Sequence, residues 1–181
     1  MSCDLTTGRA LPCKDSVGGL KAVYFIDYAD LSLSEVTYDV TNTDVITALD
    51  TTSVEAFQYD IKGNSSFEQA FTSNRETRTT FFEQTLNLTF TKLDKASHKE
   101  LKLLAYGRPR VIVEDYNGSF FVMGLAHGAE VTGGTIVTGG AMGDLSGYTL
   151  VLSGQERVPA NFLASDLASA NVTVSATQID P

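Results

Sequence analysis

Residues 81–91 carry the clearest alternation of apolar and polar side chains in the chain. The even positions hold four large apolar residues, namely Phe82, Leu86, Leu88 and Phe90. Gln84 alone interrupts this row, and the odd positions are mostly polar, with threonine the most frequent residue. A period of two over about ten residues predicts a strand with one buried face and one wet face.

Shorter segments rich in β-branched and aromatic residues predict further strands at 21–28, 54–60 and 67–71. The first of these has an apolar run in its middle and is expected to be buried on both faces. Between the first two lies a long polar excursion, residues 29–52. We expect little regular structure there beyond a weak strand at 35–40 and a short apolar patch after it.

Residues 72–80 contain no hydrophobic side chain and lie between two predicted strands. They are expected to form a long hairpin tip, or an arm that projects from the body of the domain. An ordinary solvated hairpin tip has the same composition, so a contact role and a solvated role both stay open for this segment.

A single helix is predicted at 97–106. Ser97 followed by Glu100 is typical of a capping box, in which each side chain bonds the backbone N–H of the other residue. One face of the segment is apolar and carries Leu101, Leu104 and Ala105. Gly107 stands where a left-handed helix cap is expected, and Pro109 prevents the helix from continuing.

The second half of the chain predicts a β-hairpin over 110–124, because Asn117-Gly118 separates two apolar runs and suits a tight turn. The last core strand is expected at 148–152, and residues 159–163 are expected to leave the sheet. Between these elements, residues 131–140 contain the sequence Val-Thr-Gly-Gly twice and predict a flexible loop.

The apolar residues of this tandem are candidates for contact with a neighbouring copy of the chain. They are Val131, Ile136 and Val137. A plain glycine loop without such a role explains the pattern equally well.

These elements together predict a mainly β fold, either a β-sandwich or a half-barrel with one flanking helix. A length of 181 residues is typical of one domain. We expect an N-terminal arm at 1–20, a β domain at 21–163 and a C-terminal extension at 164–181.

The chain is acidic, with 13 Lys+Arg against 22 Asp+Glu and a formal net charge of −9. This balance argues against a protein that grips nucleic acid, because phosphate binding needs clustered basic side chains. The short basic stretch Arg108-Pro109-Arg110 is expected to follow the helix with both charges solvated.

The N-terminus lacks the pattern of a secretory signal, and no apolar run is long enough to predict a membrane-spanning helix. Cys3 and Cys13 are therefore expected to be reduced thiols. A zinc site would need two further ligands at motif spacing, and the sequence offers none near them.

Sequence motifs for a nucleophile elbow, a phosphate-binding loop, a zincin helix or a dinucleotide-binding turn are absent. His98 is expected on the solvent side of the helix, and His127 in a loop. The neighbouring carboxylates Glu114 and Asp115 could perform acid–base chemistry, but the ends of hairpins carry such residues routinely. We therefore predict that the protein is not an enzyme and holds no cofactor and no metal.

The order of these elements resembles that of tailed-bacteriophage tail-tube and ring proteins. The stretches that carry the resemblance are 78–91, 97–106, 110–124 and 144–156. The opening segments 3–9, 14–19 and 21–28 look like structural proteins of phages that infect Bacteroidetes, including the crAss-like group.

The resemblance implies a tail-tube-like domain that forms a hexameric or dodecameric ring, with sheets joined across subunits around a lumen for DNA. The lumen-lining residues would be Glu83, Thr85, Asn87 and Thr89, on the wet face of 81–91. The polar arm would contact a neighbouring subunit or the next ring through Thr72, Arg75, Glu76 and Arg78.

From this resemblance we predict a non-enzymatic virion structural protein, a ring of the tail tube or of the head–tail connector, located in the tail or neck and assembled in the host cytoplasm. Its partners would be further copies of itself and adjacent tail or neck proteins. DNA would pass through without specific binding, and no membrane would be involved. The tube protein of a bacterial contractile secretion or injection system is a close alternative.

An extracellular binding or adhesion β-sandwich is the alternative from a different class. It would present exposed aromatic side chains on a concave face, for which Tyr24, Tyr28 and Tyr59 are the candidates. A hydrolase is a third alternative, disfavoured by the missing pair of nucleophile and base.

Overall fold

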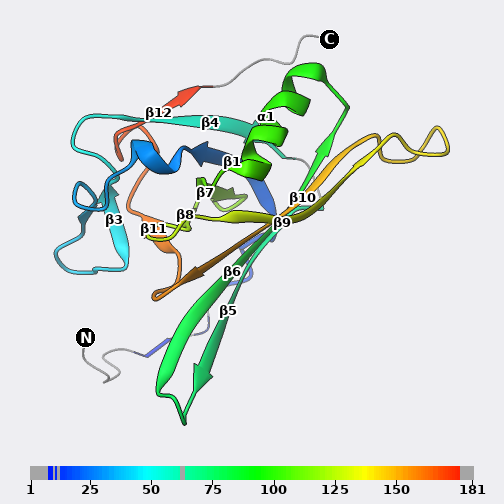
Figure 1. The fold of residues 1–181 in the computed structure, drawn as a ribbon. Coiled ribbons are helices and arrows are strands. Elements are labelled where there is room, and N and C mark those ends of the chain that lie inside the picture. The colour runs from blue at the N-terminus through cyan, green and yellow to red at the C-terminus, as the bar shows by residue number, and fades with distance from the viewer. Residues whose placement is uncertain (1–7, 10, 12, 62–63, 176–181) are drawn as a thin grey trace.

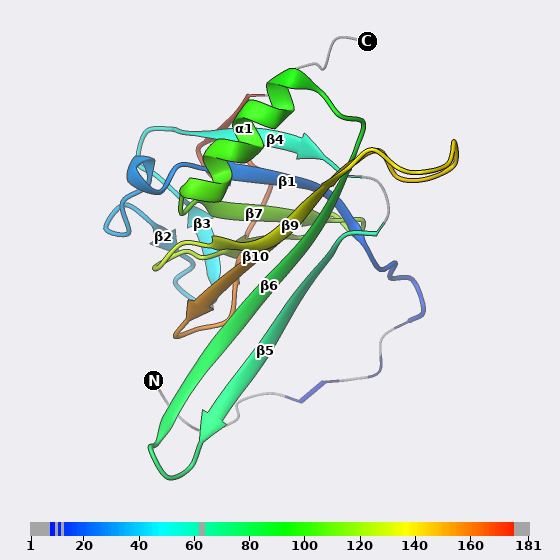
Figure 2. The ribbon, with the colours of Figure 1, turned by 45° about the vertical axis from the view of Figure 1, so that its right-hand side comes forward.

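The fold is mainly β, with two sheets and one flanking α-helix, as the sequence predicted (Figure 1). The computed structural model describes residues 8–9, 11, 13–61 and 64–175. The larger sheet forms a half-barrel, and the smaller sheet packs against one of its faces. Two strands of the smaller sheet run on as a long hairpin away from the body (Figure 2).

The larger sheet has eight strands in the order β12-β4-β1-β7-β8-β11-β3-β2. The pairs β12–β4 and β11–β3 are parallel, and the other pairs are antiparallel. Its strands are β1 (Leu20–Ile26), β2 (Thr37–Tyr38), β3 (Val45–Ala48), β4 (Val54–Asp60), β7 (Arg110–Asp115), β8 (Phe120–Met123), β11 (Asn161–Leu163) and β12 (Val172–Ser175).

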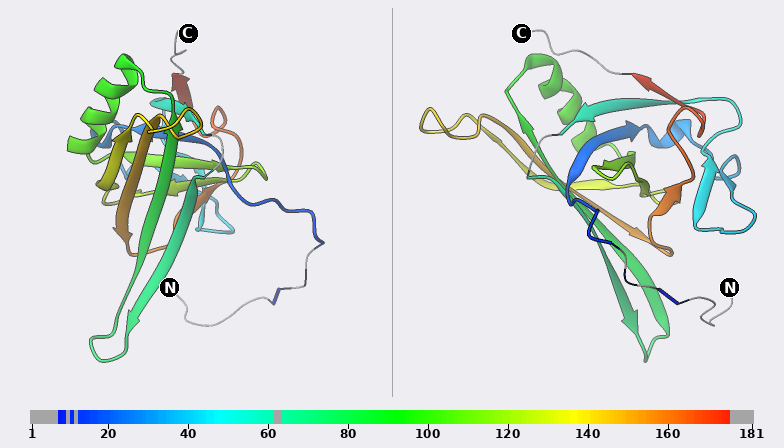
Figure 3. Two further views of the ribbon diagram at one scale, coloured as in Figure 1. Left: turned by 90° about the vertical axis from the view of Figure 1, so that its right-hand side faces the viewer. Right: turned by 180° about the vertical axis from the view of Figure 1, so that it is seen from behind.

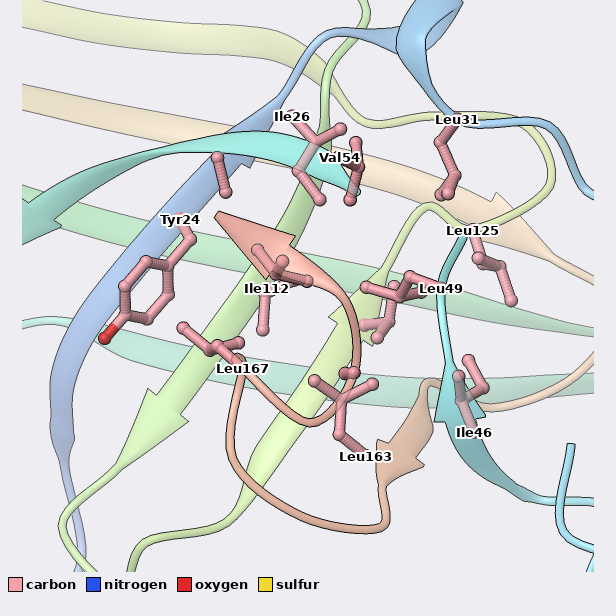
Figure 4. Close-up of a cluster of buried hydrophobic side chains, with 14 of the residues drawn as sticks. Tyr24, Ile26, Leu31, Ile46, Leu49, Val54, Ile112, Leu125, Leu163 and Leu167 are labelled. Carbon is pink, nitrogen blue, oxygen red and sulfur yellow. The ribbon is translucent and has the colours of Figure 1, made fainter. Parts of the chain in front are cut away.

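The larger sheet curls around the first of two apolar cores (Figure 4). β3 and β12 lie far apart in the strand order, yet the chain links them just beyond their ends. The Leu49 N–H donates to the carbonyl of Ala170, and the Val54 N–H donates to that of Asn171, each over 3.0 Å. These bonds hold the curl nearly closed around buried side chains that include Tyr24, Ile26, Leu31, Ile46, Leu49, Ile112, Leu125, Leu163 and Leu167.

The smaller sheet has four antiparallel strands in the order β5-β6-β10-β9. They are β5 (Ser66–Asn74), β6 (Thr79–Thr91), β9 (Glu130–Val137) and β10 (Gly147–Glu156). The inner face of this sheet meets the outer face of the half-barrel and forms the second core, which includes Val23, Phe25, Val111, Val113, Leu86, Leu88 and Leu152. β1 and β7 are therefore buried on both faces, which confirms the expectation for the first strand.

β6 follows the predicted alternation. Leu86 and Leu88 are fully buried, and the polar residue in their row, Gln84, is also buried. The Gln84 Oε1 accepts a hydrogen bond from the Gly124 N–H over 2.9 Å, so its burial leaves that oxygen satisfied. Gly124 has a φ of 66°, and a Cβ there would lie 2.5 Å from the carbonyl carbon of Gly128, so only glycine fits the turn that offers this N–H.

The α-helix, α1 (Lys95–Tyr106), begins earlier than predicted because Asp94 caps it rather than Ser97. The Asp94 carboxylate accepts from the Ser97 N–H over 2.9 Å and also from its hydroxyl. Gly107 is extended, with a φ of −89°, so the expected left-handed cap is absent. Its N–H instead donates to the carbonyls of Leu103 and Leu104.

Three segments differ from the sequence-based expectation. Most of the tandem glycine segment is not a loop, because residues 130–137 form β9 at the border of the smaller sheet, and only 138–140 lie in the loop that follows. Residues 161–163 do not leave the sheet but form β11, between β8 and β3. Residues after 164, expected as an extension, contribute β12 to the larger sheet and Leu167 to its core.

Arg110 also differs from the expectation of a solvated charge. It is 2% exposed, and its guanidinium donates to three backbone carbonyls, those of Leu125, Tyr28 and Leu31, over 2.6–2.7 Å. Burial lowers the pKa of Arg110 from its usual range. The side chain therefore ties the short 3-10 helix η1 (Tyr28–Asp30) to the turn that follows β8. Arg108, in contrast, is exposed and lies over the Tyr28 ring at 3.9 Å.

Candidate assembly surface on the small sheet

The outward face of the smaller sheet, called the polar face below, is defined by the odd positions of β6. The four predicted lumen residues all lie on it, because Glu83 is exposed and Thr85, Asn87 and Thr89 are half-buried, whereas the residues between them are buried. The strand register places Thr149, Val151, Ser153 and Gln155 of β10 opposite them on the same face, so Val151 is an apolar residue within it. The wet face predicted from the sequence is therefore confirmed as a surface, and its role in lining a lumen stays a prediction.

Formal charge on the polar face is negative only. The register aligns Glu68 with Thr85 and Glu130 with Ser153, so these two carboxylates share the face with Glu83. Among the outward-facing positions of the four described strands, no lysine or arginine occurs. A surface of this composition repels phosphate and offers it no charge-assisted hydrogen bond.

Hydroxyl and amide side chains on the polar face bond one another across the strands. The hydroxyls of Thr135 and Thr149 lie 2.7 Å apart, and the Asn87 amide donates to the Ser66 hydroxyl over 3.4 Å. The Thr89 hydroxyl donates to the Asn64 carbonyl. These hydrogen bonds occupy polar groups that would otherwise be free to bind a ligand, and they stabilise the pairing of the strands.

Both borders of the smaller sheet are unpaired within the described part of the chain. β5 pairs only with β6, and β9 pairs only with β10. The β5 side chain of Gln69 accepts from the Ala160 N–H over 2.7 Å, which ties the base of β5 to the segment before β11. Beyond this tie, β5 offers free backbone groups, and such edges are templates for pairing with another chain.

The β5–β6 hairpin projects from the body, as predicted for residues 72–80 (Figure 2). Thr72 lies in β5, and Arg75, Glu76 and Arg78 lie in or beside its four-residue turn, all of them exposed. The Asn74 side chain builds the turn by accepting from the N–H groups of Glu76 and Thr77. Every described residue from 70 to 80 is exposed, so no residue in the outer part of the hairpin is buried against the body.

Charges at the hairpin tip have no ionic partner within the described residues. The ion pairs found there are Lys21–Glu114, Lys99–Glu100 and His127–Glu156, all in the body of the domain. The tip therefore presents both signs of charge to solvent or to a neighbour.

Phe71 is a contact candidate that the sequence reasoning missed. Its side chain is 76% exposed near the middle of the hairpin, beside Phe82 at a ring-centroid distance of 6.4 Å. Phe71 shares its side of β5 with Phe67, which packs against the second core. Only the length of the projection shows that the body does not reach it.

The three apolar candidates of β9 do not gather on one face. Val131 packs against the second core. Ile136 is 59% exposed and lies opposite Tyr148 on the inner side of the sheet, whereas Val137 is half-buried and lies opposite Gly147 on the polar face. Of these three, Ile136 has the most apolar surface available for a neighbouring copy.

Titratable residues elsewhere have structural partners. The buried Glu114 accepts from the Tyr24 hydroxyl over 2.7 Å and pairs with Lys21, whose pKa its hydrogen bond and charge raise. The buried Glu156 accepts from the N–H groups of Ala126 and His127 and bonds the His127 ring. His98 is exposed on α1, as predicted. These contacts stabilise turns and strands and do not converge on a common cleft.

Metal-ligand clusters of three or more His, Cys, Asp or Glu side chains do not occur in the described part of the chain. Cys13 is an exposed free thiol, and Cys3 lies outside the described residues. No helix within the described ranges has the length and apolar character needed to cross a membrane.

The tyrosines proposed for a binding module do not form an exposed aromatic face. Tyr24 is buried in the first core, and Tyr59 packs edge-on against Phe25 in the second. Burial, followed by the hydrogen bond and charge of Glu114, raises the pKa of Tyr24 well above its usual range. The ring of Tyr28 is covered by the guanidinium groups of Arg108 and Arg110.

Comparison with known proteins gave no match, whether the chain was set against family models, curated proteins or solved structures.

Proposed function

We propose that this protein is a non-enzymatic phage virion component that assembles into a ring of the tail tube or head–tail connector. The ring lines a conduit through which DNA passes without specific binding. Its partners are further copies of the chain and the adjacent tail or neck proteins, and it acts in the virion after assembly in the host cytoplasm.

The observation that carries this proposal is the composition of the polar face. Glu68, Glu83 and Glu130 are its only charged side chains among the described residues, and the hydroxyls and amides between them bond one another. A conduit for a polyanion needs a wall that neither binds phosphate nor excludes water, and this face meets both requirements.

The two open borders and the projecting hairpin support assembly from copies of the same chain. A ring in which β5 and β9 gain neighbours removes two exposed edges at once. An isolated two-stranded hairpin is marginally stable in water, so the outer hairpin gains most from a neighbour that packs against Phe71.

Electron microscopy of the purified protein, combined with light scattering, tests the proposal directly. We expect annular particles whose mass is a multiple of the subunit, consistent with six or twelve copies. A strictly monomeric protein at every concentration, alone and with adjacent tail or neck proteins, would show the proposal to be wrong.

Removal of residues 72–80, with a two-residue turn closing the shortened hairpin, tests the arm as an interface. We expect the free energy of unfolding of the monomer to change by less than about 1 kcal/mol, because none of these residues is buried against the body. Assembly should be lost. A matched control shortens the solvated loop at 138–146 instead, and a ring that forms equally well from both variants would remove the arm from the interface.

Glu83→Lys tests the polar face as the wall of the conduit. Lysines repeated around a ring would converge on one channel, so the assembled variant should bind duplex DNA in a salt-dependent way that the natural protein does not. Glu55→Lys, on an exposed position of β4, is the matched control with the same change in charge. Equal DNA binding by the two variants would place Glu83 outside the conduit.

A further inference from the structure

A cavity of about 160 Å³ lies between the two sheets. Its walls include residues of β6 and β10 from the smaller sheet and of β8 and β11 from the larger one, and the strands of the two sheets cross one another (Figure 3). The cavity is deep on one side, where Gln84, Val122, Glu156 and Asn161 are buried, and open on the other, where Tyr38 is 38% exposed. We call it the amide cavity, after the two amide side chains that line it.

Gln84 presents an unpaired amide nitrogen to the amide cavity. The residue interrupts the apolar row of β6 and is 1% exposed. Its Oε1 accepts from the Gly124 N–H, so the nitrogen points away from Gly124, and it has no acceptor among the described residues. Every fully enclosed side-chain nitrogen or oxygen of those residues has a partner, so this nitrogen reaches open space, and the amide cavity is the space that Gln84 lines.

Asn161 contributes a second amide to the same space. The residue is 6% exposed, and its side chain makes no hydrogen bond within the described part of the chain. By the reasoning applied to Gln84, both of its polar atoms reach the amide cavity. Buried amides without partners are costly and therefore rare. These two residues offer donors from Gln84, and both a donor and an acceptor from Asn161, to whatever fills the cavity.

Glu156 adds an acceptor to the amide cavity and disfavours anions. Its Oε1 accepts from the N–H groups of Ala126 and His127, whereas its Oε2 bonds the His127 ring alone and can accept once more. The carboxylate repels an anionic ligand. A cation gives the Gln84 N–H groups no acceptor, and an apolar ligand leaves both amides unpaired. The ligand that fits is neutral and carries both donors and acceptors.

Hydroxyl groups on a compact ring meet this requirement, because each hydroxyl donates and accepts at one atom. The apolar part of the lining, which includes Val122, Leu125 and the Tyr38 ring, suits the C–H faces of such a ring. The size also agrees, because an apolar cavity of about 150 Å³ holds benzene, another six-membered ring.

We propose that the amide cavity binds one neutral monosaccharide unit. A single copy of the chain supplies all the residues of the site, so the inference does not rest on the proposed ring. Ordered water is the competing occupant, since water also pairs with buried amides.

Saturation-transfer NMR with the natural protein tests the proposal with D-glucose, D-galactose and D-mannose as probes. We expect saturable binding of at least one of them, with a Kd on the order of 1 mM because one ring makes few contacts. The uronic acid of the bound sugar should bind at least about tenfold more weakly, because its carboxylate meets Glu156. No saturable binding of any of the three sugars, which is the result for a cavity that holds water only, would overturn the proposal, and so would equal binding of the uronic acid.

Asn161→Leu tests the site itself, because it keeps the size of the side chain and removes both polar atoms. We expect sugar binding to weaken by about tenfold or more. Gln155→Leu is the matched control, since it makes a similar change at an exposed position of β10 that faces away from the cavity. If both variants bind the sugar equally well, it binds elsewhere and the proposal is wrong.

Tyr38→Ala is a second variant, at an exposed position where truncation does not empty a core. It should weaken binding by about fivefold or more, through the loss of the ring at the open side, and unchanged binding would contradict the proposed stacking. Unchanged circular dichroism of each variant shows that folding is not the cause.

Two further comparisons define the ligand and separate this site from the proposed function. Equal binding of the methyl glycoside and the free sugar indicates the end unit of a glycan, whereas loss of binding by the methyl glycoside indicates a free monosaccharide. A protein that binds the sugar but never assembles supports the amide cavity and contradicts the ring. A ring that binds none of the sugars does the reverse.

Discussion

The two sheets of this protein differ in how much of their faces they bury. The half-barrel encloses one apolar core, shares a second with the smaller sheet, and is linked across its open side by backbone hydrogen bonds between residues 49–54 and 170–171. The smaller sheet buries one face only, leaves both borders unpaired and extends a hairpin into solvent. The half-barrel therefore buries side chains on both faces of its central strands, whereas the outward face and the outer hairpin of the smaller sheet remain accessible to a neighbour.

This difference separates the residues that fold the chain from those available for assembly. Burial of apolar area and satisfaction of buried polar groups concentrate in the half-barrel and at its contact with β6 and β10. The polar face and outer hairpin contribute little to either. Substitutions in the half-barrel should therefore change the free energy of unfolding, whereas substitutions on the polar face or the outer hairpin should change assembly.

Arg110→Met gives the largest expected effect on stability and tests whether the half-barrel depends on a buried charge. The change leaves three carbonyls without their donor, two of them buried and one partly buried, and we expect a loss of about 3–5 kcal/mol in the free energy of unfolding. Urea denaturation measures it. Arg108→Met is the control, because Arg108 stacks on the same Tyr28 ring from an exposed position. Equal losses of unfolding free energy for both variants would mean that stacking on Tyr28, and not the hydrogen bonds to the carbonyls, accounts for the stabilisation.

Ile112→Ala and Phe71→Ala compare the two regions directly. Ile112 is fully buried, so its truncation should cost about 2–5 kcal/mol, with no specific effect on assembly at temperatures where the variant remains folded. Phe71→Ala should change the free energy of unfolding of the monomer by less than about 0.5 kcal/mol and weaken assembly. If Phe71→Ala destabilises the monomer as much as Ile112→Ala does, the proposed separation between residues that stabilise the fold and residues available for assembly is wrong.

Asp94→Ala has a modest expected effect and extends the comparison to α1, which lies beside the smaller sheet. Hydrogen bonds from Ser97 lower the pKa of the Asp94 carboxyl. A carboxyl with a lowered pKa in the folded state stabilises above its unfolded pKa of about 4, and this stabilisation is lost as the pH falls through the folded value.

The melting temperature of Asp94→Ala should therefore be lower by roughly 2–4 °C at neutral pH, and the gap from the natural protein should close in acid. Thermal unfolding at a series of pH values measures the gap. Ser97→Ala is the companion variant, because it keeps the backbone bond to Asp94 and removes only the hydroxyl. A gap that is constant with pH would show that the Asp94 charge is not involved in the cap.

Residues of the smaller sheet show how far local pattern predicts a site. The alternation of β6 placed Glu83, Thr85, Asn87 and Thr89 on one wet face, and the structure has them there. The alternation does not place Glu68 and Glu130 on that face, because they reach it only through the cross-strand register. The tandem glycine segment was expected as a loop, since glycine weakens a strand locally, yet pairing with β10 makes it one.

The sequence by itself determined the β class, the single helix, the projecting hairpin, the tight turn at Asn117-Gly118 and the wet face of β6. Each of these follows from side chains close together in the chain, whose period and turn chemistry act locally. Only the tertiary structure decided the burial of Arg110, the return of β11 and β12 to the larger sheet, and the exposure of Phe71. These depend on contacts between residues far apart in the chain, where partners supplied at a distance outweigh local preference.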